Sequence, residues 1–172
     1  MKKVLLMIAA VVMIAACNKE ETGEKNKITF GNETADIVVN ACGYLAENHF
    51  IGVAGYHFDA DFTLNGCNCH IFTNVSATGK GKKTELGKEQ TQVGYSFEIN
   101  SDSEKGYPYD IHAYCYEYSG GKLEHSTVGT WFKSGTMELK DDGKTLILNV
   151  KGTLADDRAF SMNITTESKE FK

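Results

Sequence analysis

Residues 136–164, TMELKDDGKTLILNVKGTLADDRAFSMNI, decide the fold of this chain. Apolar residues alternate with polar ones in three successive runs, and the runs are separated by acidic segments at 141–143 and 156–157. A period of two is typical of a half-buried β-strand, and an Asp-Gly pair supplies the positive φ angle of a tight hairpin turn. The stretch therefore predicts an antiparallel meander of three strands.

The same alternation occurs upstream of the meander. In residues 92–100, every second residue is apolar, which places Val93, Tyr95, Phe97 and Ile99 on one face. Further strands are expected at 36–43, 50–58, 59–64, 67–75, 109–118 and 122–132, with a glycine hairpin at 119–122. Many short strands joined by hairpins are typical of an all-β fold, either a single antiparallel β-sandwich or a closed β-barrel.

Two segments interrupt the strand pattern. Residues 40–48 are compatible with a turn or a short helix, although Gly43 weakens a helix. Residues 77–91, ATGKGKKTELGKEQT, are rich in glycine and lysine and predict a long mobile loop or hairpin tip. Pro108 is expected at a strand start, where the lack of a backbone N–H disrupts the hydrogen bonds of the sheet least.

The N-terminus has the parts of a secretory signal peptide. Lys2 and Lys3 precede an apolar run at 4–16, which ends directly at Cys17. A helix of this length spans roughly 20 Å, whereas a hydrocarbon core is about 30 Å thick. We therefore expect residues 1–16 to be a cleaved signal rather than an anchor.

Behind the signal, the chain divides into a linker, one domain and a tail. Residues 17–27 are almost wholly polar and predict a flexible linker, followed by a β domain at 28–167 and a tail at 168–172. Without its first two lysines, the chain has 16 basic and 23 acidic residues, a formal net charge of −7. This balance argues against nucleic acid as a partner and against electrostatic attraction to anionic lipids.

Two short motifs around the cleavage point carry a resemblance. The segment Ile14-Ala15-Ala16-Cys17 resembles the bacterial lipobox, in which lipoprotein signal peptidase cuts before a cysteine that carries acyl chains. The next four residues, NKEE, resemble the signal that sends lipoproteins of Bacteroidota to the outer face of the outer membrane. Each buried methylene contributes about 0.8 kcal/mol, so acyl chains on Cys17 would hold a domain on the membrane.

The C-terminal hairpin extends this resemblance. Residues 134–139, SGTMEL, and 142–146, DGKTL, resemble the terminal meander of small β-rich lipoproteins of Bacteroidota, with Met137 and Leu146 in place of the more usual valine and tyrosine. The resemblance implies a β-sandwich or calycin-like barrel in the cell envelope. It implies surface display, or alternatively a position on the periplasmic side, and no particular reaction or ligand.

If Cys17 is lipidated, the remaining cysteines are Cys42, Cys67, Cys69 and Cys115. An even number of cysteines in an exported chain favours disulfides. A bridge between Cys67 and Cys69 would close a very tight loop. We therefore expect Cys42 and Cys115 each to pair with one of those two, or a single bridge with two buried thiols.

The same region contains histidines as well as thiols, but their spacing does not favour a metal site. On a strand, His70 points away from Cys67 and Cys69, and the same parity separates His112 from Cys115. We expect no metal and no other cofactor. The sequence contains no nucleophile elbow, zinc-protease, Walker or dinucleotide motif, so no catalytic residue is assigned.

Two sets of polar residues are candidates for a site. Asp59 and Asp61 share one strand face, with Asp110 as a possible third member, and such carboxylates bind calcium, act as acid and base, or form a solvated face. A second set on one strand face can stack on sugars or peptides and donate hydroxyl groups. It consists of His112, Tyr114, Tyr116 and Tyr118.

Alternatively, the tyrosines have a structural role and are covered by neighbouring strands or a loop. Trp131, the only tryptophan, is expected in the core rather than on a binding platform. We expect a non-enzymatic surface lipoprotein that binds a glycan, a peptide or a small apolar molecule. The alternatives are a structural or adhesin-type envelope component that assembles with proteins, and a hydrolase that uses Asp59 and Asp61.

Overall fold

The computed structural model describes residues 25–88, 93–102, 109–115, 118–119, 122–123 and 131–171. Almost all of them lie in strands. The strands are β1 (Lys27–Phe30), β2 (Glu33–Asn48), β3 (Val53–Leu64), β4 (Cys67–Ser76), β5 (Lys83–Leu86), β6 (Tyr95–Ser101), β7 (Ile111–Cys115), β8 (Tyr118–Ser119), β9 (Lys122–Leu123), β10 (Phe132–Asp141), β11 (Thr145–Leu154), β12 (Ala159–Glu167) and β13 (Glu170–Phe171). A 3₁₀ turn, η1, spans Ala77–Gly79.

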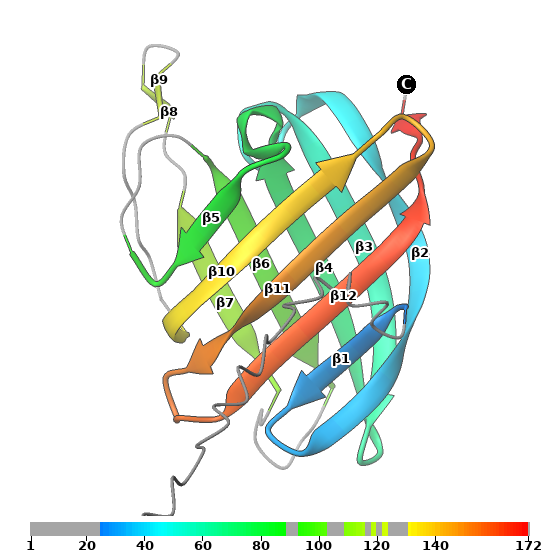
Figure 1. Ribbon diagram of the computed structural model, residues 1–172, viewed down its shortest axis with the longest axis vertical. Coiled ribbons are helices and arrows are strands. Elements are labelled where there is room, and N and C mark those ends of the chain that lie inside the picture. Colours follow the sequence, from blue (N-terminus) through cyan, green and yellow to red (C-terminus); the bar gives the residue numbers. More distant parts are fainter. Residues whose placement is uncertain are drawn as a thin grey trace, which may run out of the picture.

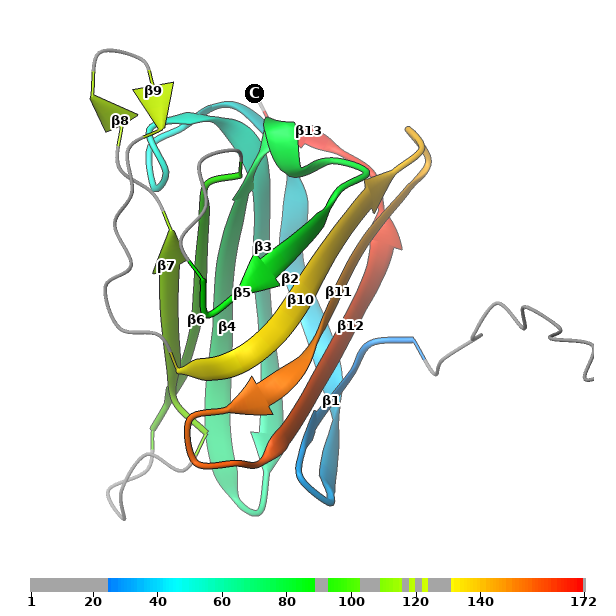
Figure 2. The ribbon, with the colours of Figure 1, turned by 60° about the vertical axis from the view of Figure 1, so that its left-hand side comes forward.

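One continuous sheet makes up the body of the protein. Its strand order is β5-β10-β11-β12-β1-β2-β3-β4-β6-β7, and every neighbouring pair is antiparallel. The sheet curls into a nearly closed barrel with two facing layers, β10, β11, β12 and β1 in one and β2, β3, β4, β6 and β7 in the other (Figure 1). The turned view shows the two edge strands, β7 and β5, on opposite sides of the opening (Figure 2). The prediction of a single antiparallel β-sandwich or barrel is confirmed.

The core lies between the two layers, where every second residue of each strand points inward. Phe160 on β12 joins the layers, because its ring contacts Phe30 at 5.1 Å, Phe132 at 5.5 Å and Phe97 at 5.9 Å between centroids. These four rings are almost fully buried. Edge-on contacts of this kind add about 0.5–1.5 kcal/mol each to the burial of apolar area. The alternation of Tyr95, Phe97 and Ile99 predicted from the sequence places all three inside.

The expected turn or short helix at 40–48 is wrong, because β2 runs through it as a strand. Ala41 pairs with Asp59 and Leu45 with Gly55, and the register slips between Val39 and Ala41. The slip is a bulge that bends the long strand. Pairing with β3 supplies the backbone hydrogen bonds, so tertiary context overrides the weak local preference.

The expected loop at 77–91 also differs from the structure. Its described part contains η1 and β5, and β5 pairs with β10 from Leu86↔Gly135 to Lys83↔Glu138. Thr84 and Leu86 point inward and are buried. The sequence did not indicate this strand, because only two of its four side chains face the core and the segment is mostly polar.

The chain ends of the domain are also paired. Glu170 and Phe171 form a short parallel strand beside Tyr44 and Leu45 of β2, so the expected separate tail at 168–172 joins the sheet. Among the described residues, no helix is long and apolar enough to span a membrane. Residues 1–24, including Cys17 and the segment expected to be a signal sequence, lie outside the described part of the chain.

The strands expected at 36–43, 67–75 and 92–100 are confirmed with shifted bounds as β2, β4 and β6, whereas residues 124–130 of the strand expected at 122–132, and Pro108, lie outside the described residues. The two strands expected at 50–58 and 59–64 are one strand, β3, and the strand expected at 109–118 is the shorter β7. The expected hairpin at 119–122 corresponds to β8 and β9, which pair with each other.

Candidate ligand-binding face

The outward side chains of β3, β4, β6 and β7 lie on one side of the sheet, the outer face, on which Asn74 and Ser96 are buried. Antiparallel register aligns them in rows that cross the strands. The rows are His57–Asn74–Ser96–Tyr114, Asp59–Phe72–Glu98–His112 and Asp61–His70–Asn100. The two candidate sets of the sequence, the aspartates of β3 and His112 with Tyr114 of β7, thus lie on the same side of the sheet.

A hydrogen-bonded acidic group lies at one end of this face. The side-chain amide of Asn40, at the bulge of β2, donates to Asp59 Oδ1 at 2.9 Å and to Asp61 Oδ2 at 2.7 Å. His70 Nδ1 lies 2.8 Å from Asp61 Oδ1. The hydrogen bonds from Asn40 and His70 hold the pKa of the Asp61 carboxyl below its usual range. Asp110 is not part of this group, because its carboxylate accepts from the backbone N–H and hydroxyl of Ser101 at 2.7 Å.

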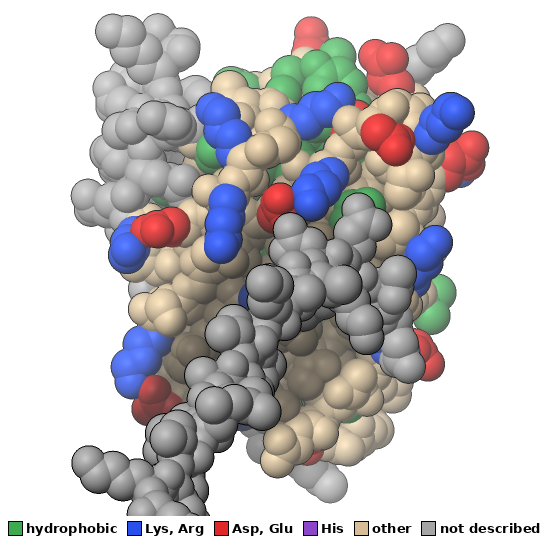
Figure 3. All heavy atoms as spheres, viewed as in Figure 1, with side chains coloured by type: hydrophobic (Ala, Val, Ile, Leu, Met, Phe, Trp, Pro, Cys, Tyr) green, Lys and Arg blue, Asp and Glu red, His purple; other side chains and the backbone are tan. Residues whose placement is uncertain are grey.

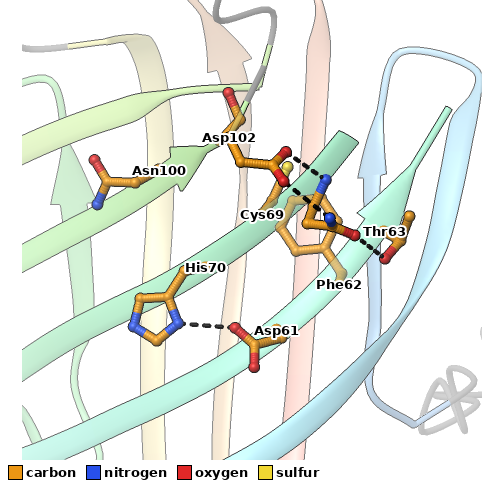
Figure 4. Close-up of a pocket in the computed structure, with 9 residues that line it drawn as sticks. Asp61, Phe62, Thr63, Cys69, His70, Asn100 and Asp102 are labelled. Atoms are coloured by element: carbon orange, nitrogen blue, oxygen red, sulfur yellow. Dashed lines mark hydrogen bonds and ion pairs between the residues drawn. The ribbon is translucent and has the colours of Figure 1, made fainter. Parts of the chain in front are cut away.

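A shallow cavity of about 580 Å³ opens beside the Asp61–His70 pair. Figure 4 shows His70 and Asp61 facing each other on neighbouring strands, with Asn100 and Asp102 contributed by β6 and the residue after it. Asp102 is fixed in place by Asn68, whose backbone N–H and side-chain amide both donate to its carboxylate at 2.9 Å. The lining is therefore a set of positioned polar groups with apolar atoms beneath them.

Aromatic rings lie next to the acidic group. Phe50, in the turn between β2 and β3, packs edge-on against Phe72 at 4.7 Å and stacks on His57 at 5.8 Å. Asn48 holds this turn, because its side-chain oxygen accepts from the N–H of Phe50 and its amide donates to Asn74 Oδ1. Phe50 remains 52% exposed. We call Phe50, His57 and Phe72 the first ring group.

A second ring group, His112, Tyr114 and Trp131, lies over β7. The parity predicted for this strand is confirmed, with Ile111, Ala113 and Cys115 inside and His112 and Tyr114 outside. The hydroxyl of Tyr114 lies 3.4 Å from His112 Nδ1. The side chains of Tyr116 and Tyr118 lie outside the described part of the structure.

The prediction that Trp131 belongs to the core is wrong. Trp131 is 44% exposed, and its ring lies 6.5 Å from that of His112. The next residue, Phe132, begins β10 and takes the inward position, with 2% exposure. Because neighbouring residues of an extended chain point in opposite directions, Trp131 is left on the outside.

Charge is divided between the two layers. Strands β2, β3, β4, β6 and β7 contain no lysine or arginine, whereas Asp59, Asp61 and Glu98 point outward from them. The other layer carries its cations on β1, β5, β10 and β11, and Figure 3 shows lysine side chains over its outside. These cations are Lys27, Lys83, Lys133, Lys140 and Lys151. The outer face is thus acidic, aromatic and free of strand-borne cations.

The expected disulfides are absent, since none of the four described cysteines, Cys42, Cys67, Cys69 and Cys115, is in a disulfide. A disulfide needs Cα atoms within about 7 Å, and strands two places apart are already separated by about 10 Å. β3 lies between the strands of Cys42 and Cys69, and β6 lies between those of Cys69 and Cys115. Cys42, Cys69 and Cys115 are instead buried as small apolar side chains.

The alternation of side chains along the strand predicted that His70 points away from Cys67 and Cys69. In the structure both thiols point inward and His70 points outward. Within the described ranges, no cluster of three or more His, Cys, Asp or Glu side chains could hold a metal ion.

Several residues of the outer face had no signal in the sequence. Asn40 sits at a bulge, Phe50 in a turn, and Phe72 and Glu98 on strands whose neighbours only the register reveals. The alternation of 67–75 could have placed His70 outward, but not beside Asp61.

The chain matches no family model, and neither a curated protein nor a solved structure resembles it closely enough to count as a relative.

Proposed function

We propose that this chain is a surface-exposed lipoprotein that binds glycans through the outer face and does not transform them chemically. The observation that carries the proposal is the combination of exposed aromatic rings with fixed carboxylate, amide and imidazole groups on one open surface. Sugar rings present C–H groups that stack on aromatic faces and hydroxyls that bond to such polar groups. The outer face offers both kinds of contact within a few strand spacings.

The inside of the barrel does not favour a small apolar ligand. Phe30, Phe58 and Phe97 are buried between the layers with at most 1% exposure, so side chains fill the interior. The cavity beside Asp61 and a second one beside Gly135 are both open to solvent. An apolar molecule gains most from an enclosed site, whereas a hydroxyl-rich ligand suits an open, polar one.

The proposed attachment to the membrane rests on the sequence alone. Cleavage before Cys17 and acylation of its thiol would tether the domain through the linker at 17–27. Mass spectrometry of the mature protein tests this part. An acylated Cys17 at the new N-terminus supports it, and an unmodified thiol or an uncleaved start contradicts it.

Glycan binding has a direct optical test, because Trp131 is the only tryptophan and its exposed ring lies beside His112 of the outer face. The purified protein is titrated with a panel of neutral oligosaccharides while tryptophan emission is recorded, with isothermal calorimetry in parallel. We expect saturable binding that Phe50→Ala and Trp131→Ala weaken. Lys83→Ala, on the opposite layer, is the matched control and should bind like the wild type.

A panel without a single binder would contradict the proposal, as would full affinity in both ring variants. The alternative, a structural component that assembles with proteins, would show itself in the same preparation as self-association by size-exclusion chromatography with no response to glycans.

A further inference from the structure

We infer that the ligand of the outer face is an oligosaccharide without acidic groups that lies across the strands and contacts both ring groups. This inference rests on the proposed glycan-binding function and adds the class of glycan. Two independent features carry it: the spacing of the ring groups and the distribution of charge.

Both ring groups have a member in one register row, with one residue between them. Phe72 on β4 is opposite Glu98 on β6, and Glu98 is opposite His112 on β7. Two strand spacings separate the backbone of Phe72 from that of His112, about 10 Å. The exposed rings, Phe50 and Trp131, belong to different groups. A pyranose ring is comparable in length to one strand spacing, so a ligand that covers the surface from Phe72 to His112 needs at least two sugar units.

The surface between the ring groups suits the hydroxyls of a sugar chain. Glu98 accepts a 2.9 Å hydrogen bond from the hydroxyl of Ser96, which leaves its second carboxylate oxygen for a ligand. Asn100 lies one row further along β6, on the wall of the cavity beside Asp61. A chain that crosses β4, β6 and β7 would therefore meet hydrogen-bonding groups along its length and aromatic rings near both ends.

The charge of the same surface excludes acidic sugars. Recognition of a carboxylate or sulfate group uses arginine or lysine, and the five strands of this layer contain neither. Asp59, Asp61 and Glu98 would instead repel such a group. Uncharged sugars and amine-bearing sugars escape this penalty, and the carboxylates favour the latter.

The experiment uses the mature protein at neutral pH and measures dissociation constants by calorimetry. Neutral and amine-bearing tetrasaccharides (cellotetraose, mannotetraose, chitotetraose and its deacetylated form) are compared with their monosaccharides. We expect the tightest tetrasaccharide to bind at least about tenfold more tightly than its monosaccharide. Phe50→Ala and Trp131→Ala should each remove most of this gain, because each leaves only one ring group.

Charge exclusion is tested on the same tetrasaccharide after oxidation of its C6 hydroxyls to carboxylates. We expect the oxidised compound to bind at least about tenfold more weakly. Glu98→Gln should recover part of this loss, whereas Glu138→Gln, a matched change on the opposite layer, should not. Recovery by Glu98→Gln separates repulsion from the loss of a hydroxyl contact.

The outcomes separate the inference from the function on which it rests. Equal affinity for monosaccharide and tetrasaccharide overturns the crossing ligand. Equal affinity for the neutral and oxidised compounds, or no recovery by Glu98→Gln, overturns the exclusion of acidic groups. In these cases glycan binding itself stands. If no sugar binds, the proposed function fails and the inference falls with it.

Discussion

The phenol of Tyr56 donates a 3.0 Å hydrogen bond to the carboxylate of Asp141 and so joins the two layers of the barrel at one end. Tyr56 lies on β3 and Asp141 ends β10. The ammonium group of Lys80 lies 3.2 Å from the same carboxylate oxygen, and the N–H of Gly143 donates to the other oxygen at 2.9 Å. The Asp141 side chain is only 10% exposed, so this carboxylate depends on its protein partners.

The Asp141 contacts make the stability of the fold depend on acid. Burial raises the pKa of Asp141, but hydrogen bonds from Ser168, Gly143, Tyr56 and Lys80 outweigh it and lower the pKa to about 2. An unfolded aspartate has a pKa of about 3.9, so the folded state is stabilised by about 2 kcal/mol above that pH. This stabilisation is lost as the pH falls from about 4 to about 2.

Urea unfolding at neutral and at acidic pH measures this effect. Asp141→Asn should lower the free energy of unfolding by about 2 kcal/mol at neutral pH, and the difference should shrink toward zero near pH 2. Asp36→Asn, which breaks an exposed ion pair with Lys27, is the control and should cost less than about 1 kcal/mol. A difference for Asp141→Asn that does not vary with pH would contradict the assignment.

The four thiols should be reduced and unequally reactive. Burial raises the pKa of Cys42 to about 11, and burial with nearby negative charges raises that of Cys69 to about 12. Because the thiolate is the nucleophile, both should resist iodoacetamide in the folded protein, and the half-buried Cys67 should react first. Peptide mapping by mass spectrometry follows each site.

Reducing agent should leave the unfolding midpoint of the protein unchanged. A bridge restored on oxidation, or a midpoint that falls on reduction, would show that two of these cysteines pair.

The backbones of β10 and β11 approach each other closely at Gly135 and Gly152, which are paired in register. A Cβ atom at Gly152 would lie 2.5 Å from the carbonyl oxygen of Ser134 and 2.9 Å from Cα of Gly135. Gly152→Ala should therefore destabilise the protein by about 1–3 kcal/mol in urea unfolding. Thr153→Ala, the next residue along β11, should change stability by no more than about 0.5 kcal/mol.

The Asn40 bridge should be visible in the titration of Asp61. Removing the amide in Asn40→Ala deletes the strongest interaction that lowers the pKa of the Asp61 carboxyl, so that pKa should rise toward its usual range. NMR titration of the side-chain carboxyl reports it directly. His70→Ala should raise the pKa by a smaller amount, and an unchanged value in Asn40→Ala would show that the amide does not bridge the two aspartates.

Strand alternation made most of the interior predictable from the sequence. The inward positions of Phe97, Ile111 and Phe160 follow from a period of two, which is a local property of an extended backbone. The acidic turn at 141–143 was equally readable, because the side chains of Asp141 and Asp142 cap its backbone N–H groups.

The errors of the sequence reading arose where a segment depends on a distant partner. β5 has only two apolar side chains and forms because β10 offers a free edge, and the end of β2 is extended because β3 runs beside it. Trp131 looked like a core residue by type, yet the inward position belongs to its neighbour Phe132.

The sequence by itself determined the β class, the inward-facing residues of most strands, the C-terminal meander of β10, β11 and β12, and the lipobox pattern on which the proposed membrane attachment rests. The tertiary structure decided which strands are neighbours, and therefore the absence of disulfides among the described cysteines and the composition of the outer face. The physical reason is that alternation arises within a single strand, whereas the register that places Asp61 beside His70 and Glu98 between Phe72 and His112 is set by hydrogen bonds between strands.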